Sequence, residues 1–161
     1  MSLLLNKGKI GNLELKNRVV MPPMCMYKSD NSGELKDFHM FHYTSRAMAD
    51  VGLIIVEATS VEPKGRISSF ELGLWDDFLI EKKKKMNEKL HLFGAKSSIQ
   101  LAHAGRKSEV VDDICVAPSS IAFSQKSPYK VPKALSLEEI TKIKELFVNA
   151  AIRAEKANYD S

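Results

Sequence analysis

The sequence has few of the features that mark secreted or membrane-bound proteins. Its two cysteines, Cys25 and Cys115, lie far apart and form neither a Cys-x-x-Cys motif nor a disulfide framework. The amino-terminal MSLLLNKGK has three consecutive leucines before polar residues, too few for a secretory signal. No apolar run approaches the ~20 residues that cross a bilayer. These absences predict a cytoplasmic protein with no membrane partner.

Charge of one sign and clusters of metal ligands are also scarce. A net charge of +4, scattered along the chain, argues against nucleic-acid binding. The one dense run, KKKK at 82–85, lies in a helical pattern and is predicted to be a solvated helix face. His39 and His42 have helical i, i+3 spacing but lack the further ligands that a zinc site needs. We therefore predict no metal site.

The amino-terminal third predicts a hairpin, a strand and a helix. Residues 9–17 alternate apolar and polar around a Gly-Asn pair, which indicates a β-hairpin. Residues 18–21 form a short strand that two prolines end, because proline cannot donate to a ladder. After a loop, Asp37 is predicted to cap a helix that ends at Gly52. The apolar positions of this helix are Phe38, Phe41, Met48 and Val51.

The rest of the chain continues the alternation of strands and helices. Residues 53–56 read as a strand buried on both faces, and residues 97–101 as a further strand. Between them a helix is predicted to begin near Asp76, with Leu79, Met86, Leu90 and Phe93 on one face before Gly94. A long loop that includes Pro128 follows. Ser136 and Glu139 then form a capping box before an apolar stripe of Ile140, Ile143, Phe147, Ala150, Ala151 and Ala154.

The end of the sequence indicates how the fold is completed. Asn158 suits a left-handed helix cap, and residues 159–161 resemble the start of another strand. The order of a hairpin, about three βα units and a strand stub predicts an α/β fold with a parallel sheet. A complete (β/α) barrel needs about 250 residues, more than the 161 present. An open strand edge is an aggregation liability, so we expect either a covering partner or a fragment.

Three predicted strand ends carry side chains suited to chemistry, and parallel strands bring such ends to one edge. The first is MPPMCMY at 21–27, which offers backbone donors, a thiol and a phenol. The second, VEAT at 56–59, is small at Ala58 and leaves room for a flat ligand. In the third, QLAHAGRK at 100–107, the carboxamide of Gln100 can both donate and accept hydrogen bonds.

Several of these side chains have a plainer alternative. A lone cysteine such as Cys25 or Cys115 is more often a small buried hydrophobe than a reactive thiol. Tyr27 fits either an exposed loop or a ligand pocket. The cations His103, Arg106 and Lys107 fit either an anion-binding patch or a capped loop. The pair Met24 and Met26 is more consistent with side-chain packing than with a chemical role.

Taken in order, these motifs resemble a known family. They are RVVM at 18–21 with PMCMY at 23–27, GLIIVEA at 52–58, GR at 65–66, LW at 74–75 and QLAHAGRK at 100–107. Together they resemble the N-terminal half of Old Yellow Enzymes, in particular the bacterial thermophilic-like NADPH dehydrogenases. The resemblance implies that residues 1–161 are the incomplete N-terminal part of one FMN-binding TIM (β/α)8 barrel.

The resemblance also implies roles for particular residues. The cofactor-binding positions would be Pro22, Pro23, Met24, Cys25, Ala58 and Gln100. Cys25 would lie near the flavin edge, Ala58 beside the ring, and Gln100 at its pyrimidine side. Tyr27 would point into the substrate pocket. Pro22 departs from the serine or other small residue that relatives often carry, which removes a hydroxyl contact but keeps backbone contacts.

The implied activity is reduction of the C=C bond of enones or enals by NADPH or NADH through FMN. The family's substrate-anchoring His pair follows the fourth strand, beyond Ser161, and the His39 and His42 pair lies instead on the first helix. We therefore expect the isolated chain to be inactive, with a missing C-terminal half or a second copy as its partner. A self-associating half-barrel and a fragment of a dienoyl-CoA-reductase-like flavoenzyme are the alternatives.

Overall fold

The centre of the fold is a parallel sheet built around one long strand. The computed structural model describes residues 2–110, 114–126 and 129–161, and Pro128 of the predicted loop lies outside these ranges. Strand β4 (Leu53–Ser60) pairs along its length with β6 (Lys96–Ala102). On its other side, β3 (Val20–Met21) pairs with the start of β4 and β5 (Leu72–Gly73) pairs with its end. All of these pairings are parallel. The predicted mixed α/β architecture is confirmed.

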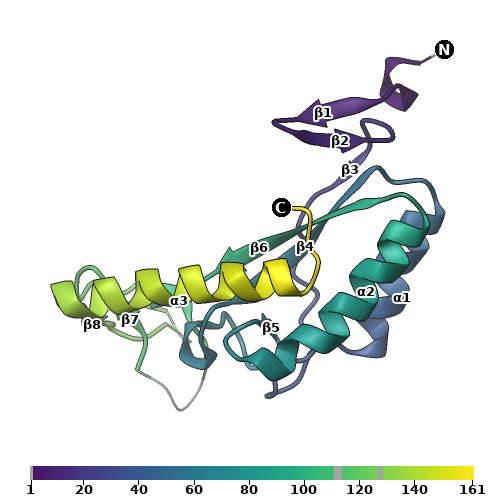
Figure 1. Ribbon diagram of the computed structural model, residues 1–161. Helices are drawn as coiled ribbons and strands as arrows, with labels where there is room; N and C mark the ends of the chain where they lie inside the picture. Colours follow the sequence, from purple (N-terminus) through teal and green to yellow (C-terminus); the bar gives the residue numbers. More distant parts are fainter. Residues whose placement is uncertain (1, 111–113, 127–128) are drawn as a thin grey trace.

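The predicted hairpin precedes the sheet and projects from it as an arm (Figure 1). Strands β1 (Gly8–Ile10) and β2 (Leu13–Leu15) pair antiparallel, with Ile10 opposite Leu13. A two-residue turn joins them, and Gly11 adopts a φ of 57° there. Glycine adopts such a conformation without the steric cost that a Cβ brings. A short 3-10 helix, η1 (Leu3–Leu5), precedes the hairpin.

In the described ranges, three α-helices cover one face of the sheet. They are α1 (Asp37–Met48), α2 (Ile80–Leu92) and α3 (Leu137–Lys156), and α2 contacts both of the others (Figure 1). The main core joins the β4 side chains Ile54 and Val56 to residues of the first two helices. A second cluster of Leu74, Leu79 and Ala154 packs against Ile99 and Leu101 of β6. The core therefore lies between sheet and helices.

Short elements complete the loops. Asp76 caps the 3-10 helix η3 (Asp77–Leu79) through its side chain, directly before α2. The other 3-10 helices are η2 (Pro63–Gly65) and η4 (Gly105–Lys107). Within the long loop before α3, β7 (Val116–Ala117) and β8 (Lys133–Ala134) form a small parallel pair. In the described part of the chain no helix is long and apolar enough to cross a membrane.

The end of the chain joins the sheet as predicted. Asn158 adopts a φ of 63°, and residues 159–161 then run alongside β6. The Asp160 amide donates to the Ser97 carbonyl at 2.8 Å, and the Ile99 amide donates to the Ser161 carbonyl at 3.1 Å. The Asp160 carboxylate also accepts hydrogen bonds from Ser97, His91 and Lys96 at 2.7–2.9 Å. These contacts hold residues 159–161 beside β6, although the segment is not assigned as a strand.

The capping box before α3 is confirmed, but its apolar stripe is only partly buried. The Ser136 hydroxyl accepts from the Glu139 amide, and the Glu139 carboxylate accepts from the Ser136 amide. Ala150 and Ala154 are buried, whereas Ala151 is exposed, contrary to the prediction. The helix therefore touches the sheet mainly through its C-terminal half.

The predicted core face of α1 is wrong. Phe38, Phe41 and Met48 are 46%, 74% and 65% exposed, and the buried residues of the helix are His39, Tyr43 and Ala47. The N-cap is Lys36 and the helix begins at Asp37, so it starts one residue earlier than the predicted Asp37 cap implies. Its orientation is set by polar contacts of His39 and Tyr43 with β4, which hydrophobic periodicity does not reveal.

The glycine predicted to end α1 has a different role. Ala49 is the C-cap and Asp50 adopts the left-handed conformation, with a φ of 67°. Gly52 instead lies against Asn17, so that a Cβ placed on it would be 2.5 Å from the Asn17 Oδ1. The Asn17 side chain in turn donates to the Asp50 carbonyl at 2.7 Å and accepts from the Val19 amide at 3.0 Å. Gly52 permits this close approach of β3 and β4.

The lysine run of α2 is not wholly solvated, which corrects a further prediction. Lys83 is fully buried, and its ammonium donates to the Gly73 carbonyl at 2.7 Å. Burial lowers the pKa of Lys83 to about 7, although Glu34 and Glu57 oppose this shift. The other lysines of the run are exposed, and Lys82 pairs with Glu34 at 3.1 Å.

Replacement of Gly52 by alanine is expected to destabilise the fold strongly. The new methyl group would overlap the Asn17 Oδ1 and the Asn17 carbonyl, which lie 2.5 and 2.7 Å from the Cβ position. Overpacking of this kind costs about 2–3 kcal/mol. The matched control is Gly11→Ala, where nothing lies within 4 Å and only the positive φ costs about 1 kcal/mol. Urea unfolding of both variants checks the difference, and equal losses would contradict the contact.

Replacement of Lys83 by methionine is expected to change how stability depends on pH. The pKa of Lys83 falls from 10.5 to about 7 on folding, so the unfolded chain binds more protons between these values. The free energy of unfolding should therefore rise with pH across this window, by on the order of 5 kcal/mol from Lys83. Lys83→Met should lack this rise and be more stable near pH 7. Urea unfolding along a pH series tests this, and parallel curves for the two proteins would contradict it.

Candidate active-site rim

The three predicted strand ends meet at one edge of the sheet. Val56 pairs with Ile99 and Thr59 pairs with Leu101, so a β-bulge in β4 sets Glu57 and Ala58 opposite Gln100. Strand β3 lies on the other side of β4 and leads directly into the segment 22–27. Bulges beside functional sites re-aim side chains. We call this edge, formed by residues 22–27, 57–58 and 100, the rim.

Cys25 and Ala58 are neighbours at the rim. The Ala58 backbone and the Tyr27 side chain both hydrogen-bond the half-buried Cys25 sulfur. Burial raises the pKa of the Cys25 thiol, and the carboxylates of Glu71 and Glu57 raise it further. The two hydrogen bonds act in the opposite direction but are smaller effects. Cys25 is therefore held as a neutral thiol near pH 7, since thiolates require a lowered pKa.

Tyr27 is held in an unusual backbone conformation. Its φ is 52°, in the left-handed region that residues with a Cβ seldom adopt, and its side chain is 43% exposed. Burial and the neighbouring Cys25 raise the pKa of the Tyr27 phenol, so the hydroxyl keeps its proton. Strain of this kind persists where surrounding contacts enforce it and is common at functional sites.

The contact that enforces it comes from a residue that our sequence-based reasoning missed. Glu57 is 1% exposed, and its Oε2 accepts from the Met26 amide at 2.8 Å. The Tyr27 amide also donates to this carboxylate. Burial raises the pKa of Glu57, although the hydrogen bonds that it accepts oppose the rise. A single Glu inside the apolar run at 52–58 was the available signal, because buried charges need partners.

A second buried carboxylate lies close to the same segment. Glu71 is 1% exposed and accepts a hydrogen bond from the Ile67 amide. Burial raises the pKa of Glu71 to about 7, and the charge of Glu57 contributes to the rise. Within the described residues its Oε1 has no hydrogen-bond partner. Glu71 follows a loop with no periodic pattern, so nothing in the sequence marked it.

The remaining predicted rim residues are accessible. Pro22, Met24 and Gln100 are exposed, and Pro23 is half-buried. The Gln100 carboxamide makes no hydrogen bond to any residue that the structure describes, so its donor and acceptor are free for a ligand. A small buried side chain, a neutral thiol and a free carboxamide therefore line one edge. This donor set suits a flat heterocycle that both donates and accepts hydrogen bonds.

The cations after β6 form a capped loop and not a free anion-binding patch. The His103 Nδ1 accepts from the Gly105 amide at 3.0 Å, and its Nε2 lies 2.8 Å from the Glu62 Oε1. Arg106 and Lys107 lie over the Phe123 ring, at 6.0 and 4.1 Å from its centroid. Of the two interpretations left open by the sequence, the structure supports the capped loop.

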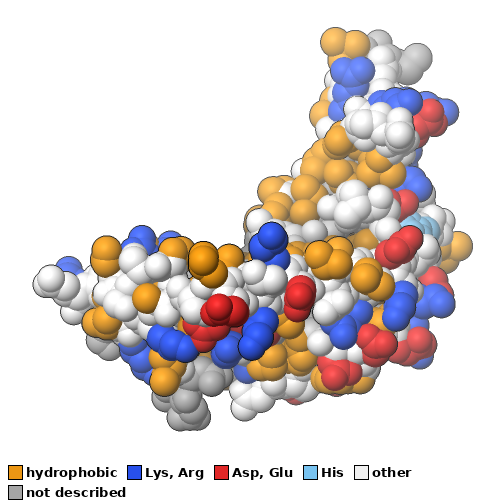
Figure 2. Space-filling model, turned by 60° about the vertical axis from the view of Figure 1, so that its left-hand side comes forward, with side chains coloured by type: hydrophobic (Ala, Val, Ile, Leu, Met, Phe, Trp, Pro, Cys, Tyr) orange, Lys and Arg blue, Asp and Glu red, His pale blue; other side chains and the backbone are white. Residues whose placement is uncertain are grey.

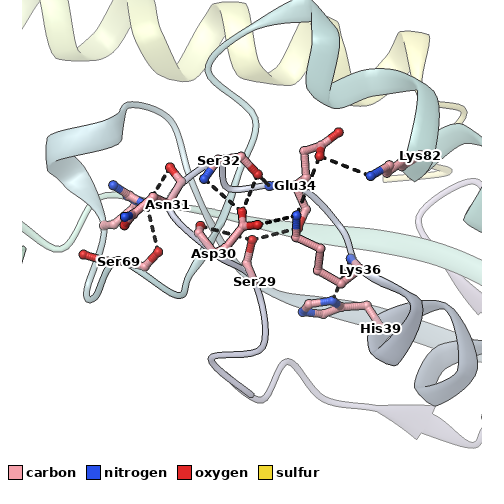
Figure 3. Close-up of polar contacts among 10 residues, drawn as sticks. Ser29, Asp30, Asn31, Ser32, Glu34, Lys36, His39, Ser69 and Lys82 are labelled. Atoms are coloured by element: carbon pink, nitrogen blue, oxygen red, sulfur yellow. Dashed lines mark hydrogen bonds and ion pairs between the residues drawn. The ribbon is translucent and has the colours of Figure 1, made fainter.

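The loop that follows Tyr27 is fixed by a polar network (Figure 3). The Asp30 carboxylate accepts from the Ser32 amide at 3.0 Å and pairs with Lys36 at 2.6 Å. These contacts, led by the Lys36 ammonium, hold the pKa of Asp30 well below its usual range. At the other side the Arg66 guanidinium donates to the Asn31 and Ser69 carbonyls. The network anchors the distal end of the segment that carries Cys25.

Cys115 and His42, the other titratable side chains considered above, lie outside the rim. Cys115 is buried beside β7, and its sulfur lies 4.0 Å from the Lys130 carbonyl. His42 stacks on Phe38 with ring centroids 5.9 Å apart. Among the residues that the structure describes, no group of three or more His, Cys, Asp or Glu side chains is placed to hold a metal ion.

Comparison with known proteins gives a consistent assignment. The chain matches the NADH:flavin oxidoreductase / NADH oxidase family over residues 7–161. It is 49% identical over 152 residues to an NADPH dehydrogenase of Clostridium acetobutylicum, covering 94% of this chain and 44% of that protein. An NADPH dehydrogenase of Bacillus pumilus is 51% identical over 147 residues, covering 91% and 43% respectively. The chain thus spans less than half the length of these relatives.

Solved structures agree with this result. Morphinone reductase in complex with tetrahydroNAD superposes with a TM-score of 0.90 and 31% identity, covering 99% of this chain and 48% of that one. Old Yellow Enzyme from Pichia sp. AKU4542 superposes with a TM-score of 0.89 and 30% identity, covering 98% and 44%. The predicted resemblance is therefore confirmed. The chain belongs to the NADH:flavin oxidoreductase / NADH oxidase family, which includes Old Yellow Enzyme.

Proposed function

We propose that this chain forms the N-terminal part of a single FMN-binding TIM barrel that reduces the C=C bond of α,β-unsaturated carbonyl compounds with NADPH or NADH. One observation carries the proposal. Cys25, Ala58 and Gln100 converge at the carboxyl edge of a parallel sheet, in a chain of a flavin oxidoreductase family. Barrel enzymes place their active sites at this edge.

The exposure of the sheet supports a partial barrel. Ile99 and Leu101 of β6 pack against the helix-side core, so the alternating residues Ser98 and Gln100 face away from the helices. Ser98 is half-buried and Gln100 exposed, and Val20 of β3 is 40% exposed. In a closed barrel this second face would be the interior, which side chains from other strands fill.

The accessible apolar side chains favour a partner on this side of the molecule. Figure 2 shows hydrophobic side chains gathered where the hairpin arm meets the body. Exposed apolar patches of this kind mark surfaces that associate. We propose that the partner is the remaining half of the barrel, which the relatives carry in one chain. A second copy of this chain, as in a self-associating half-barrel, is the competing occupant.

Each rim residue would have a defined task in holding FMN. The free carboxamide of Gln100 would bond the pyrimidine edge of the ring, and Ala58 would let the ring lie close to β4. Pro22, Pro23, Met24 and Cys25 would border the ring, with backbone groups in place of the hydroxyl that Pro22 lacks. Tyr27 would present its protonated hydroxyl to the substrate. The bound flavin supplies the hydride chemistry, and the protein supplies orientation and electrostatics.

The isolated chain is expected to show little or no turnover. Residues 1–161 supply three strand ends of the rim, and the family's substrate-anchoring His pair is expected in the part that only the longer relatives contain. Catalysis depends on holding the reacting groups in place together. Robust FMN-dependent reduction of an enone by the purified chain would contradict this part of the proposal.

A chimera tests the proposed function directly. The chain would replace the matching N-terminal segment of the Clostridium acetobutylicum NADPH dehydrogenase, to which it is 49% identical. We expect the chimera to bind FMN and to oxidise NADPH in the presence of 2-cyclohexenone. Gln100→Ala should weaken FMN binding about tenfold, because one or two hydrogen bonds to the ring are lost. FMN fluorescence quenching measures the affinity.

The control for this variant is Gln125→Ala, which changes an exposed carboxamide that is not one of the residues defining the rim. It should leave the FMN affinity unchanged. A folded chimera that binds no FMN, or one in which both glutamine variants bind FMN like the unmodified chimera, would contradict the assignment of the rim.

A further inference from the structure

The β-bulge at the rim frees one residue of β4 from the regular ladder. Two residues, Glu57 and Ala58, stand opposite Gln100, between the paired positions of the two strands. The Glu57 amide does not continue the ladder but donates to the Tyr43 hydroxyl of α1 at 3.0 Å. The bulge therefore turns Glu57 toward the helix layer while Ala58 remains at the rim.

Tyr43 closes a ring of hydrogen bonds on the same residue. Its hydroxyl accepts from the Glu57 amide and donates to the Glu57 Oε1 at 3.3 Å. Tyr43 is 1% exposed, so water cannot replace these contacts. The His39 Nδ1 accepts from the Lys36 amide, which leaves its Nε2 to carry a hydrogen toward the Glu57 Oε1, 3.6 Å away. Helix α1 therefore holds both the backbone amide and the side-chain carboxylate of Glu57 in place.

The other carboxylate oxygen holds the segment that carries the rim side chains. The Glu57 Oε2 accepts from the Met26 amide at 2.8 Å, and the Tyr27 amide donates to the same carboxylate. These two amides follow directly after Cys25. Two adjacent N–H groups bound to one carboxylate define the path of the chain there, including the left-handed φ of 52° at Tyr27.

We propose that Glu57 is the positioning residue of the rim: its buried carboxylate, fixed by Tyr43, grips the Met26 and Tyr27 amides and so sets the Cys25 thiol against Ala58. The role of this thiol toward a flavin rests on the function proposed above. The grip itself does not depend on a ligand. Glu57 touches no reacting atom, and it acts only through the segment that it holds.

A carboxylate is required because several donors converge from different elements. The amides of Met26 and Tyr27 approach from the loop, and the hydroxyl of Tyr43 approaches from α1. A glutamine side chain has one acceptor oxygen, so it cannot accept from all three donors. The titratable groups that surround Glu57 are Lys83 of α2, Glu71 before β5 and His39 of α1. Burial lowers the pKa of His39 to about 4, so its imidazole is neutral near pH 7.

The test follows the reactivity of Cys25 in the 161-residue chain with Cys115→Ser as the background. Iodoacetamide alkylation rates would be measured by mass spectrometry across a pH series for Glu57→Gln and Glu71→Gln. Both changes remove a negative charge that raises the pKa of Cys25. Both should therefore shift the alkylation midpoint to lower pH and increase the rate about threefold near pH 8.

Only Glu57→Gln should also increase the rate at the high-pH plateau, where all of the thiol is ionised. Loss of the grip exposes the half-buried sulfur, and the plateau should rise about fivefold, as expected for one lost hydrogen bond. Tyr43→Phe keeps the charge but removes the hydroxyl that fixes Glu57, so its plateau should rise about twofold without the charge-driven shift. This variant keeps the test decisive if Glu57→Gln does not fold.

A core variant, Ile54→Val, controls for general loss of stability and should leave both midpoint and plateau unchanged. Plateau rates that stay equal in Glu57→Gln, Tyr43→Phe and the background would overturn the positioning role. FMN affinity, measured for Glu57→Gln in the chimera, reports separately on the proposed function. If the chimera binds no FMN while the plateau still rises, the positioning role stands and the flavin assignment fails.

Discussion

The buried carboxylate of Glu57 is the interaction on which the rest of the structure depends. It joins three parts of the chain that are remote in sequence: strand β4, helix α1 through Tyr43, and the segment after β3 through the Met26 amide. A charge in this position is costly unless its oxygens are hydrogen-bonded. Because these donors satisfy them, the same contacts that bury the charge also place Cys25 beside Ala58.

The helix layer behind the rim is consequently polar at its centre. Lys83 is buried, and its ammonium donates a hydrogen bond to the Gly73 carbonyl. The negative charges of Glu34 and Glu57 favour the protonated form of Lys83. Glu71 is buried on the loop side and raises the pKa of Cys25. Low local dielectric strengthens each of these interactions. The apolar core of Ile54, Val56, Met86 and Leu90 packs beside these buried polar residues and shields them from solvent.

Much of the fold followed from local patterns in the sequence. The hairpin, the order of strands and helices, the capping box at Ser136 and the left-handed Asn158 were predicted, because turn chemistry, capping and periodicity are local signals. The convergence of Cys25, Ala58 and Gln100 followed from the rule that parallel strands end at one edge. The roles that the family resemblance gives to these residues stay proposals.

The errors arose where a distant partner decides the outcome. Periodicity assigned Phe38 and Phe41 to the core of α1, but Tyr43 and His39 face Glu57 instead. Lys83 was expected in solvent because its run looks uniformly charged, and Gly52 was taken for a helix end although Asn17 requires it. Glu57 itself was overlooked since its partners lie in α1 and in the segment after β3, which no local pattern connects to it.

Amide hydrogen exchange tests the central claim most directly. Residues 22–35 contain no regular secondary structure, and loop amides that donate to water exchange rapidly. If the buried Glu57 carboxylate holds the Met26 and Tyr27 amides, both should exchange as slowly as the amides of β4. Exchange of the Met26 amide as rapid as that of the amide of Lys28, an exposed residue of the same segment, would contradict the account.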